Sequence, residues 1–275
     1  MGPPPDLFAE LSRWRHKAEQ RGKGCEFTSE IIPDWLNAEL MAAQEVAGVD
    51  AFSFLKASPA ERRRRERELA ERLEEELAEF QERAAKDVEK GKEPDYAALA
   101  LLLGAILTPF LQSIAVEEAM RVSVEMGIAF DPAVIGQEAT RWAREYGYDL
   151  IRGLTDTTRN VVSEAMQTFT QNPEMGREAL QQMLQPAFGQ VRAQMIAATE
   201  TTRAYSEATN EYQQLLSQAG IQTRRRWITR EDERVCPACG PLHNLTEDFW
   251  AAEYPSGPPI HPNCRCELQL EYVYD

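Results

Sequence analysis

The stretch that decides the fold is residues 191–220, which reads VRAQMIAATETTRAYSEATNEYQQLLSQAG. Eight of its residues recur at alternating spacings of four and three, the pattern of one packed face of an α-helix. They are Val191, Met195, Ala198, Thr202, Tyr205, Thr209, Tyr212 and Leu216. Three of these eight are Ala or Thr, so we expect close packing against a neighbouring helix. Gly220 suits the position just after the helix end.

The sequence N-terminal to this stretch predicts more helices and almost no strand. Ser58-Pro59 is a helix-start signal, and Asp131-Pro132 is another. Gly91 to Pro94 interrupts the first helix, and Asn172-Pro173 ends the third. The predicted helices span residues 59–90, 96–126, 132–171 and 178–184, the last ending before Pro186. Residues 61–220 are therefore predicted to form a helical body.

The first predicted helix is rich in both charges and has apolar residues on one face. It contains a run of four arginines, Arg62 to Arg65, flanked by glutamates that nearly cancel its charge. We expect these arginines to lie on a solvated helix face. Contact with phosphates is the alternative.

The second predicted helix contains an apolar run, residues 97–116, that is long enough to span a bilayer. Gly104 and Pro109 interrupt the run, and Glu117-Glu118 follow it directly. We therefore expect a buried core helix and no membrane partner. A membrane-active ejection protein that uses residues 97–116 is the alternative function.

Residues 1–60 are irregular and punctuated by glycine and proline. They also carry large apolar residues, which are too numerous for a free tail: Trp14, Phe27, Trp35, Phe52 and Phe54. We expect an N-terminal arm that docks either on the rest of the chain or on a partner.

Residues 221–275 predict a small unit of a different kind, with strand patterns at 224–228 and 266–272 and frequent prolines between them. Within it, Cys236-Pro-Ala-Cys239 and His261-Pro-Asn-Cys264 are two ligand pairs of equal spacing. Zinc suits three sulfurs and one nitrogen because it is borderline-soft and tetrahedral. We predict a structural zinc site held by Cys236, Cys239, His261 and Cys264, with Cys266 replacing His261 as the main alternative.

Two other interpretations of the cysteines stay open. A disulfide such as Cys239–Cys264 is one, and reduced cysteines that hold no metal are the other. His243 is a weaker ligand candidate, because a loop histidine is usually solvated. A zinc site would supply the stability that so small a unit lacks. The predicted fold class is thus mainly α, with long helices, followed by a small α+β zinc-stabilised C-terminal unit.

The composition limits the function. The formal net charge is −15, which opposes stand-alone binding to nucleic acid, and a hydrophobic content of 43% excludes wholesale disorder. The one basic cluster that appears uncancelled in the sequence is Arg224, Arg225, Arg226 and Arg230. We expect it to contact DNA phosphates or an acidic protein surface, and a strand edge kept soluble by arginines is the alternative.

No catalytic residue and no small-molecule cofactor site is predicted. The chain has no His-Glu-x-x-His, no Gly-x-Ser-x-Gly and no glycine-rich phosphate loop. Glu200 and Asp232 are expected to be surface carboxylates. His243-Asn244 beside the first cysteine pair resembles metal-finger nucleases, but a second histidine and a metal-binding carboxylate are missing. A metal-finger nuclease acting on DNA is therefore kept only as an alternative.

Three runs of sequence together resemble a known family. They are Met195 to Arg203, Trp227 to Cys239, and Pro258 to Cys266. In this order they are similar to the Mu F-like head-morphogenesis family, the minor head proteins of tailed bacteriophages, and the resemblance covers about residues 140–273. One departure is Ala197-Ala198-Thr199-Glu200, where the family often has Ala-Arg-Thr-Glu, so any role of that arginine is absent here.

The resemblance implies a structural minor capsid protein of the virion, assembled in the host cytoplasm. It implies binding to the portal protein, inside or beside the portal vertex of the phage head. It further implies a role in head assembly, DNA packaging and DNA ejection. Major capsid protein, scaffolding protein and packaged DNA are the other partners that it suggests.

Overall fold

The computed structural model of this chain describes residues 59–126, 132–172, 174–229 and 236–273. The predicted arm at 1–60 therefore lies, apart from its last two residues, outside the described residues. The elements are α3 (Pro59–Glu89), α4 (Tyr96–Met126), α5 (Pro132–Gln171), α6 (Arg177–Phe188), α7 (Gln190–Gln218), β1 (Thr223–Ile228), η2 (Gly240–Leu242), α8 (Glu247–Trp250) and β2 (Glu267–Tyr272).

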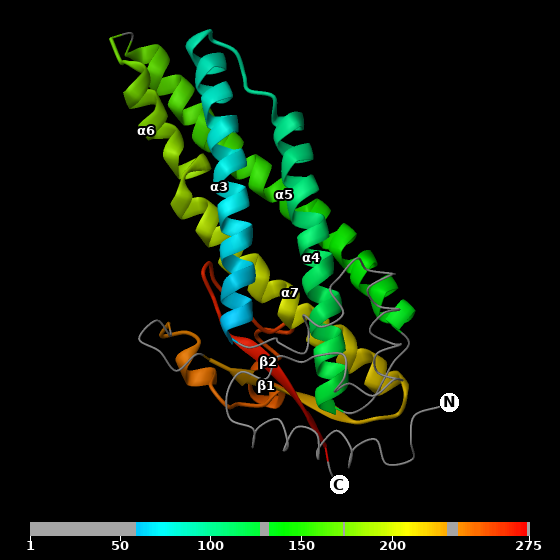
Figure 1. Ribbon diagram of the computed structural model, residues 1–275. Coiled ribbons are helices and arrows are strands. Elements are labelled where there is room, and N and C mark those ends of the chain that lie inside the picture. The colour runs from blue at the N-terminus through cyan, green and yellow to red at the C-terminus, as the bar shows by residue number, and fades with distance from the viewer. Residues whose placement is uncertain (1–58, 127–131, 173, 230–235, 274–275) are drawn as a thin grey trace.

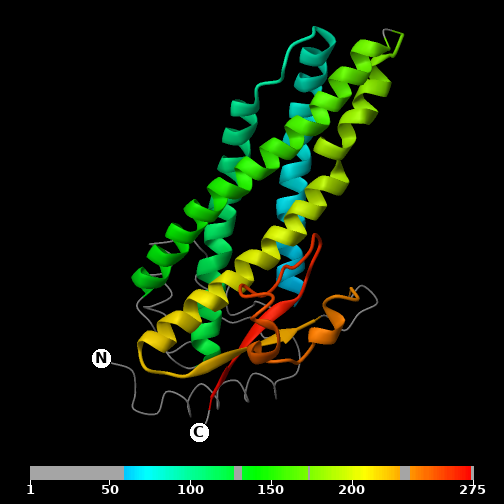
Figure 2. The same cartoon turned by 180° about the vertical axis from the view of Figure 1, so that it is seen from behind.

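The long helices form an elongated bundle of two layers, with the small sheet at one end (Figure 1). α3 and α4 form one layer, and α5 lies behind them together with α6 and α7, which follow one another end to end (Figure 2). The mainly helical fold with a small C-terminal sheet is the predicted fold class, and zinc stabilisation of that unit stays a prediction.

Helix boundaries follow the local signals in the sequence. Pro59 begins α3 and Pro132 begins α5, because a proline at the first helical position loses no helical hydrogen bond. The predicted end of α6 before Pro186 is wrong, since the helix continues to Phe188. Ala187 and Phe188 are buried in the core, and that packing carries the last turn past the proline.

α7 is the central element of the fold. It packs against α3 and α4 along its length and also contacts both strands. The predicted seam holds from Ala198 to Leu216, but Val191 is 80% exposed, so its assignment to the seam is wrong. The helix is buried beyond one seam, because the C-terminal unit covers a second face of it.

Apolar packing fills the bundle in two main clusters. One lies toward the α3–α4 turn and includes Leu73, Leu103 and Phe188; the other lies toward the sheet and includes Trp142 and Tyr205. Each fully buried Leu or Phe of this kind stabilises the fold by roughly 1.5–3 kcal/mol through removal of apolar surface from water.

α4 is the one helix among the described residues that is long and apolar enough to cross a membrane by length and composition. In the structure it packs against α5 and α7, and 44% of its apolar window is buried. The side of α4 that faces away from this packing is solvent-accessible, and its Leu101 is 76% exposed.

The run Arg62 to Arg65 is not a solvated face as a whole, which corrects the sequence-based expectation. Arg62 is only 8% exposed and its guanidinium lies 3.2 Å from Oε1 of Glu118, while Arg65 pairs with Glu117. Arg63 and Arg64 are the two that face solvent. Glu117 and Glu118, which follow the apolar run, thus form ion pairs with Arg65 and Arg62 of α3.

The C-terminal sheet is a single antiparallel pair in which Thr223 lies opposite Tyr272 and Ile228 opposite Glu267. It packs on the bundle through a cluster that joins Val122, Tyr212, Leu216 and Leu270. The predicted strand at 224–228 is confirmed within one residue, and so is the predicted strand at 266–272. The division of the chain into three domains stays a prediction.

Candidate metal centre

Two loops of the C-terminal unit carry the predicted ligands. The first follows β1 and turns at the Cys-Pro-Ala-Cys run, where the amide of Cys239 donates to Sγ of Cys236 at 3.2 Å. The amide of Gly240 also donates to the carbonyl of Cys236 at 3.0 Å, which closes the turn. This turn directs both thiols of the run to the same side.

The second loop leads into β2 and carries the other ligands. Asn263 has a φ of 61°, a left-handed conformation that Asn tolerates better than most residues. The turn at Asn263 brings the amide of Cys264 to 3.3 Å from the carbonyl of His261. His261 and Cys264 therefore face the first loop together.

The five candidate donor atoms meet in two overlapping groups. Cys236, Cys239 and His261 form one, Cys239, Cys264 and Cys266 the other, and within each group the donor atoms lie within 4.8 Å of one another. Nε2 of His261 lies 2.9 Å from Sγ of Cys236 and 3.4 Å from Sγ of Cys239. Cys239 belongs to both groups and is the centre of the cluster.

The spacing of the sulfur atoms suits one tetrahedral ion. The Sγ atoms of Cys239 and Cys264 are 3.8 Å apart. Two thiolates bound to one tetrahedral zinc at ~2.3 Å each would lie about 3.8 Å apart. The same distance is far from an S–S bond of about 2.05 Å, and the four cysteines here are free thiols. The disulfide alternative is therefore wrong for this structure.

The ring of His261 is oriented for ligation. Its Nδ1 lies 2.7 Å from the carbonyl oxygen of Pro262, and since a carbonyl only accepts, Nδ1 carries the proton. Nε2 then carries the lone pair and faces the thiols, with Sγ of Cys236 at 2.9 Å. Metal-bound histidines commonly use their second nitrogen in this way.

Three of the thiols are buried, and their pKa values are shifted in opposite directions. Cys239, Cys264 and Cys266 are buried beside Trp227 and Trp250, whose rings meet edge-to-face at 5.3 Å between centroids. Hydrogen bonds with the Cys239 and Cys266 thiols lower the pKa of Cys264, whereas those with Cys264 and Cys266 raise the pKa of Cys239. A cluster of thiols that competes for one negative charge is the donor set that a soft divalent cation would relieve.

All four predicted ligands and the alternative Cys266 lie in this cluster, but the four do not form one mutually close set. The choice between His261 and Cys266 therefore stays open. His243 is not in either group. Its Nδ1 accepts a hydrogen bond from the amide of Thr229 at 3.1 Å, so it is a half-buried structural histidine rather than a solvated one.

α7 holds the second ligand loop through two hydroxyl groups that the sequence-based prediction missed. Thr202 donates from Oγ1 to the carbonyl of Cys264 at 2.6 Å, and Oγ1 of Thr199 accepts from the amide of Asn263 at 3.0 Å. Further along the same side of α7, Asn210 donates to the carbonyl of Ser256 at 3.1 Å. Thr202 is one of the predicted seam residues, but its hydroxyl bonds the ligand loop, whereas the seam was expected to pack against a neighbouring helix.

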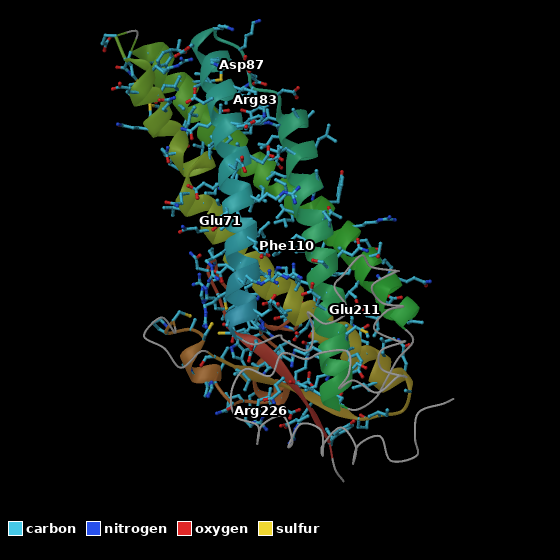
Figure 3. The ribbon with its side chains drawn as sticks, in the orientation of Figure 1. Glu71, Arg83, Asp87, Phe110, Glu211 and Arg226 are labelled. Atoms are coloured by element: carbon cyan, nitrogen blue, oxygen red, sulfur yellow. The ribbon has the colours of Figure 1, made fainter. Side chains whose placement is uncertain are left out.

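The expectation of an uncancelled basic cluster on β1 is wrong for the arginines that the structure describes. Arg224 and Arg226 both pair with Glu271, at 2.5 and 2.6 Å, and Arg225 pairs with Glu247 at 2.6 Å. Arg226 is seen at the sheet end of the molecule in Figure 3, far from Arg83 and Asp87. Arg230 lies outside the described residues. Contact of this cluster with DNA or a protein partner stays a prediction.

Glu200 is also placed differently from the expectation of a surface carboxylate. It is 6% exposed and accepts a 2.7 Å hydrogen bond from the hydroxyl of Tyr146. Burial raises the pKa of Glu200, against the lowering effect of that hydrogen bond and of Arg203. Asp232 lies outside the described residues.

Residues 156–269 match the family model described as phage Mu protein F like protein. This part of the chain is similar to the Mu F-like family. The matched region contains the end of α5, all of α6 and α7, and both ligand loops, so it includes the complete candidate metal centre. No curated protein and no solved structure matches the chain. This match supports the assignment of the chain to bacteriophage head morphogenesis and to the components of the virion.

Proposed function

We propose that this chain is a structural minor head protein that binds the portal of a tailed phage and supports head assembly, DNA packaging and DNA ejection. The observation that carries the proposal is the Mu F-like region at 156–269. In this proposal the protein lies at the portal vertex, inside or beside the capsid, and performs no catalysis.

The way the family region folds supports an assembly role. Its helical half and its cysteine-rich half are joined by hydrogen bonds that Thr202 and Asn210 donate and one that Thr199 accepts, so they form one packed body. An assembly protein needs a surface that keeps its shape when a partner binds, and a rigid, preorganised surface lowers the ordering cost of association.

We further propose that the cysteine cluster holds one structural zinc ion. The donor set fits, because the thiols of Cys236, Cys239, Cys264 and Cys266 gather with Nε2 of His261, and the Nδ1–H of that ring is already bonded to Pro262. When bound, zinc would cross-link the two loops and so add its binding free energy to folding. The residues of the chain supply the rest: a desolvated pocket beside Trp227 and the hydroxyl contacts from α7.

Co-purification with the portal tests the proposed function. The chain would be co-expressed with the portal protein of the same phage, and the portal ring isolated by size and affinity. We expect the chain to elute with the ring, and a matched experiment with an unrelated portal should leave it unbound. Elution of the chain as a free species in both experiments would refute portal binding.

A further inference from the structure

Two ion pairs join the first turns of α3 to residues 265–267, the segment that carries Cys266 and leads into β2. Nη1 of Arg62 lies 3.0 Å from Oε2 of Glu267, and Nε of Arg265 lies 3.0 Å from Oε2 of Glu66. Arg62 and Glu66 are one helical turn apart, so both face the same way. Arg265 and Glu267 flank the candidate ligand Cys266 on its two sides.

Both elements carry the cation before the anion in sequence, and the first charge of each pairs with the second charge of the other, which makes the contact specific in register. On α3 the cation comes first and the anion one turn later, and on the strand the cation precedes the ligand and the anion follows it. A shift of the strand by two residues would place like charges opposite each other, which is unfavourable. The crossed pairs therefore select one position of Cys266 relative to α3.

Arg62 is itself held in place by the bundle. Its guanidinium also lies 3.2 Å from Oε1 of Glu118 and stacks 3.9 Å above the ring of Tyr205. The side chain of Glu118 is fully buried, and Arg121 pairs with it from the next turn of α4 at 2.7 Å. An isolated exposed ion pair contributes little, but a pair anchored by a buried network loses less side-chain entropy when it forms.

The ligand loop is thus held by two helices. Thr199 and Thr202 of α7 bond the backbone at Asn263 and Cys264, and α3 pairs with the side chains at 265 and 267. α3 lies outside the region that matches the Mu F-like family, whereas the strand start at 265–267 lies within it.

We propose that Arg62 and Glu66 are positioning residues of the metal centre. They hold the segment that carries Cys264 and Cys266 in the place where its thiols can ligate zinc. The inference rests on the zinc part of the proposed function. Because coupling between two events is reciprocal, zinc binding stabilises the first turns of α3 to the same extent that those turns strengthen zinc binding.

Charge reversal of the pair formed by Glu66 and Arg265, whose side chains are both partly exposed, tests this inference. The zinc affinity of the purified full chain would be measured by competition with a chromogenic chelator for wild type, E66R, R265E and the E66R/R265E double variant. Each single reversal is expected to weaken zinc binding about tenfold, in line with other outer-shell substitutions at metal sites. The double variant restores the pair and is expected to recover most of the affinity.

A second readout does not depend on affinity. Zinc should slow hydrogen exchange of the amides near Glu66 in wild type, and this protection should be lost in R265E. Glu66→Gln removes the charge without repulsion, so it keeps the test usable if a reversal prevents folding, and it should weaken zinc binding in the same direction. Arg64→Glu is the control, because Arg64 is exposed and pairs only with Glu61 and Glu68 of its own helix in the described structure.

The outcomes separate this inference from the proposal on which it rests. Unchanged zinc affinity in both single variants, or a double variant no better than the weaker single one, would overturn the positioning role while leaving zinc binding intact. An effect of Arg64→Glu equal to that of Glu66→Arg would also overturn it. Wild-type chain that takes up no zinc would overturn both this inference and the zinc part of the proposed function.

Discussion

The hydroxyl of Thr202 in α7 donates a 2.6 Å hydrogen bond to the carbonyl oxygen of Cys264, and both groups are buried. This contact joins two sequence motifs that lie 62 residues apart. It explains why a threonine-rich helix and a cysteine-rich loop occur together in this part of the chain, because the helix forms the wall on which the ligand loop rests.

Thr202→Val should destabilise the chain measurably. Valine keeps the shape and the β-branch but leaves the carbonyl of Cys264 without this partner, and an unsatisfied buried group costs about 1–3 kcal/mol. Urea unfolding of both variants, followed by circular dichroism, would measure the loss. Thr157→Val is the control, since Thr157 is exposed and, among the described residues, its hydroxyl bonds only the backbone of its own helix, and it should stay within about 0.5 kcal/mol of wild type. Equal effects of the two substitutions would contradict the role given to Thr202.

Glu118→Gln should destabilise the bundle more strongly. Glu118 is fully buried and pairs with both Arg62 and Arg121. Its neutralisation removes the buried anion that the two cations share and leaves them only the more exposed Glu267 and Glu125, and breaking a buried pair costs about 3–5 kcal/mol. Thermal unfolding of wild type and variant would show it. Glu138→Gln, which breaks an exposed pair with Arg141, is the matched control and should have a small effect. A stable Glu118→Gln variant would show that the network contributes little.

The pH dependence of stability should reflect the same carboxylate. Burial acts to raise the pKa of Glu118, but the charges of Arg121 and Arg62 outweigh it and the pKa is lowered below 4.5. The unfolded chain then binds more protons than the folded one in acid, so this contribution is present above pH 4.5 and is lost as pH falls below that value. Unfolding measured from pH 3 to 7 should be less steep in Glu118→Gln than in wild type. Parallel curves would count against this assignment.

The contribution of Glu200 to stability should change with pH in the opposite direction to that of Glu118. Burial raises its pKa above 4.5, so the folded chain holds this proton more tightly than the unfolded one, and stability falls as pH rises from 4.5 through the raised pKa. Glu200→Gln removes the buried charge while its amide oxygen can still accept from Tyr146. We expect this variant to be as stable as wild type or more stable at pH 7, measured by urea unfolding. A large loss of stability at pH 7 would mean that the ionised carboxylate is needed.

Cys239→Ser should have the largest effect of the single cysteine substitutions on metal binding. Cys239 is the one residue that belongs to both groups of donor atoms among the described residues. We expect loss of stoichiometric zinc in this variant, measured on purified protein, and smaller effects of His261→Ala and Cys266→Ser, of which the larger identifies the fourth ligand. Cys25, the fifth cysteine of the chain, belongs to neither predicted ligand pair and lies outside the described residues, so Cys25→Ser is the control and should leave the zinc content unchanged. Full zinc content in Cys239→Ser would contradict the proposed site.

Much of the fold was predictable because its signals are local. Pro59 and Pro132 mark helix starts, and the period of the apolar residues in α4 and α7 marks their buried faces. The equal spacing of the two ligand pairs likewise predicted the cluster around Cys239.

The long-range charge pairs were not predictable in the same way. Arg62 and Glu118 are 56 residues apart, and Arg265 and Glu66 are 199 apart, so no local pattern connects them. The sequence predicts an uncancelled basic cluster on β1 because Glu247 and Glu271 are distant in sequence, yet the antiparallel pairing of β1 with β2 places Glu271 opposite Arg224. The contacts of Thr199, Thr202 and Asn210 with the C-terminal unit were not predictable either, because their partners are backbone groups of a distant loop. A helix can bury polar side chains where such backbone partners are present.

The central claim is that the cysteine cluster is a structural zinc centre which cross-links the two ligand loops of the C-terminal unit. Its most direct test is the metal content of the full chain, purified with its thiols reduced and without chelator, by inductively coupled plasma mass spectrometry. We predict about one zinc per chain, as expected of a closed four-ligand site, and loss of C-terminal folding when a strong chelator removes it. Protein that is folded and carries no zinc would contradict the account.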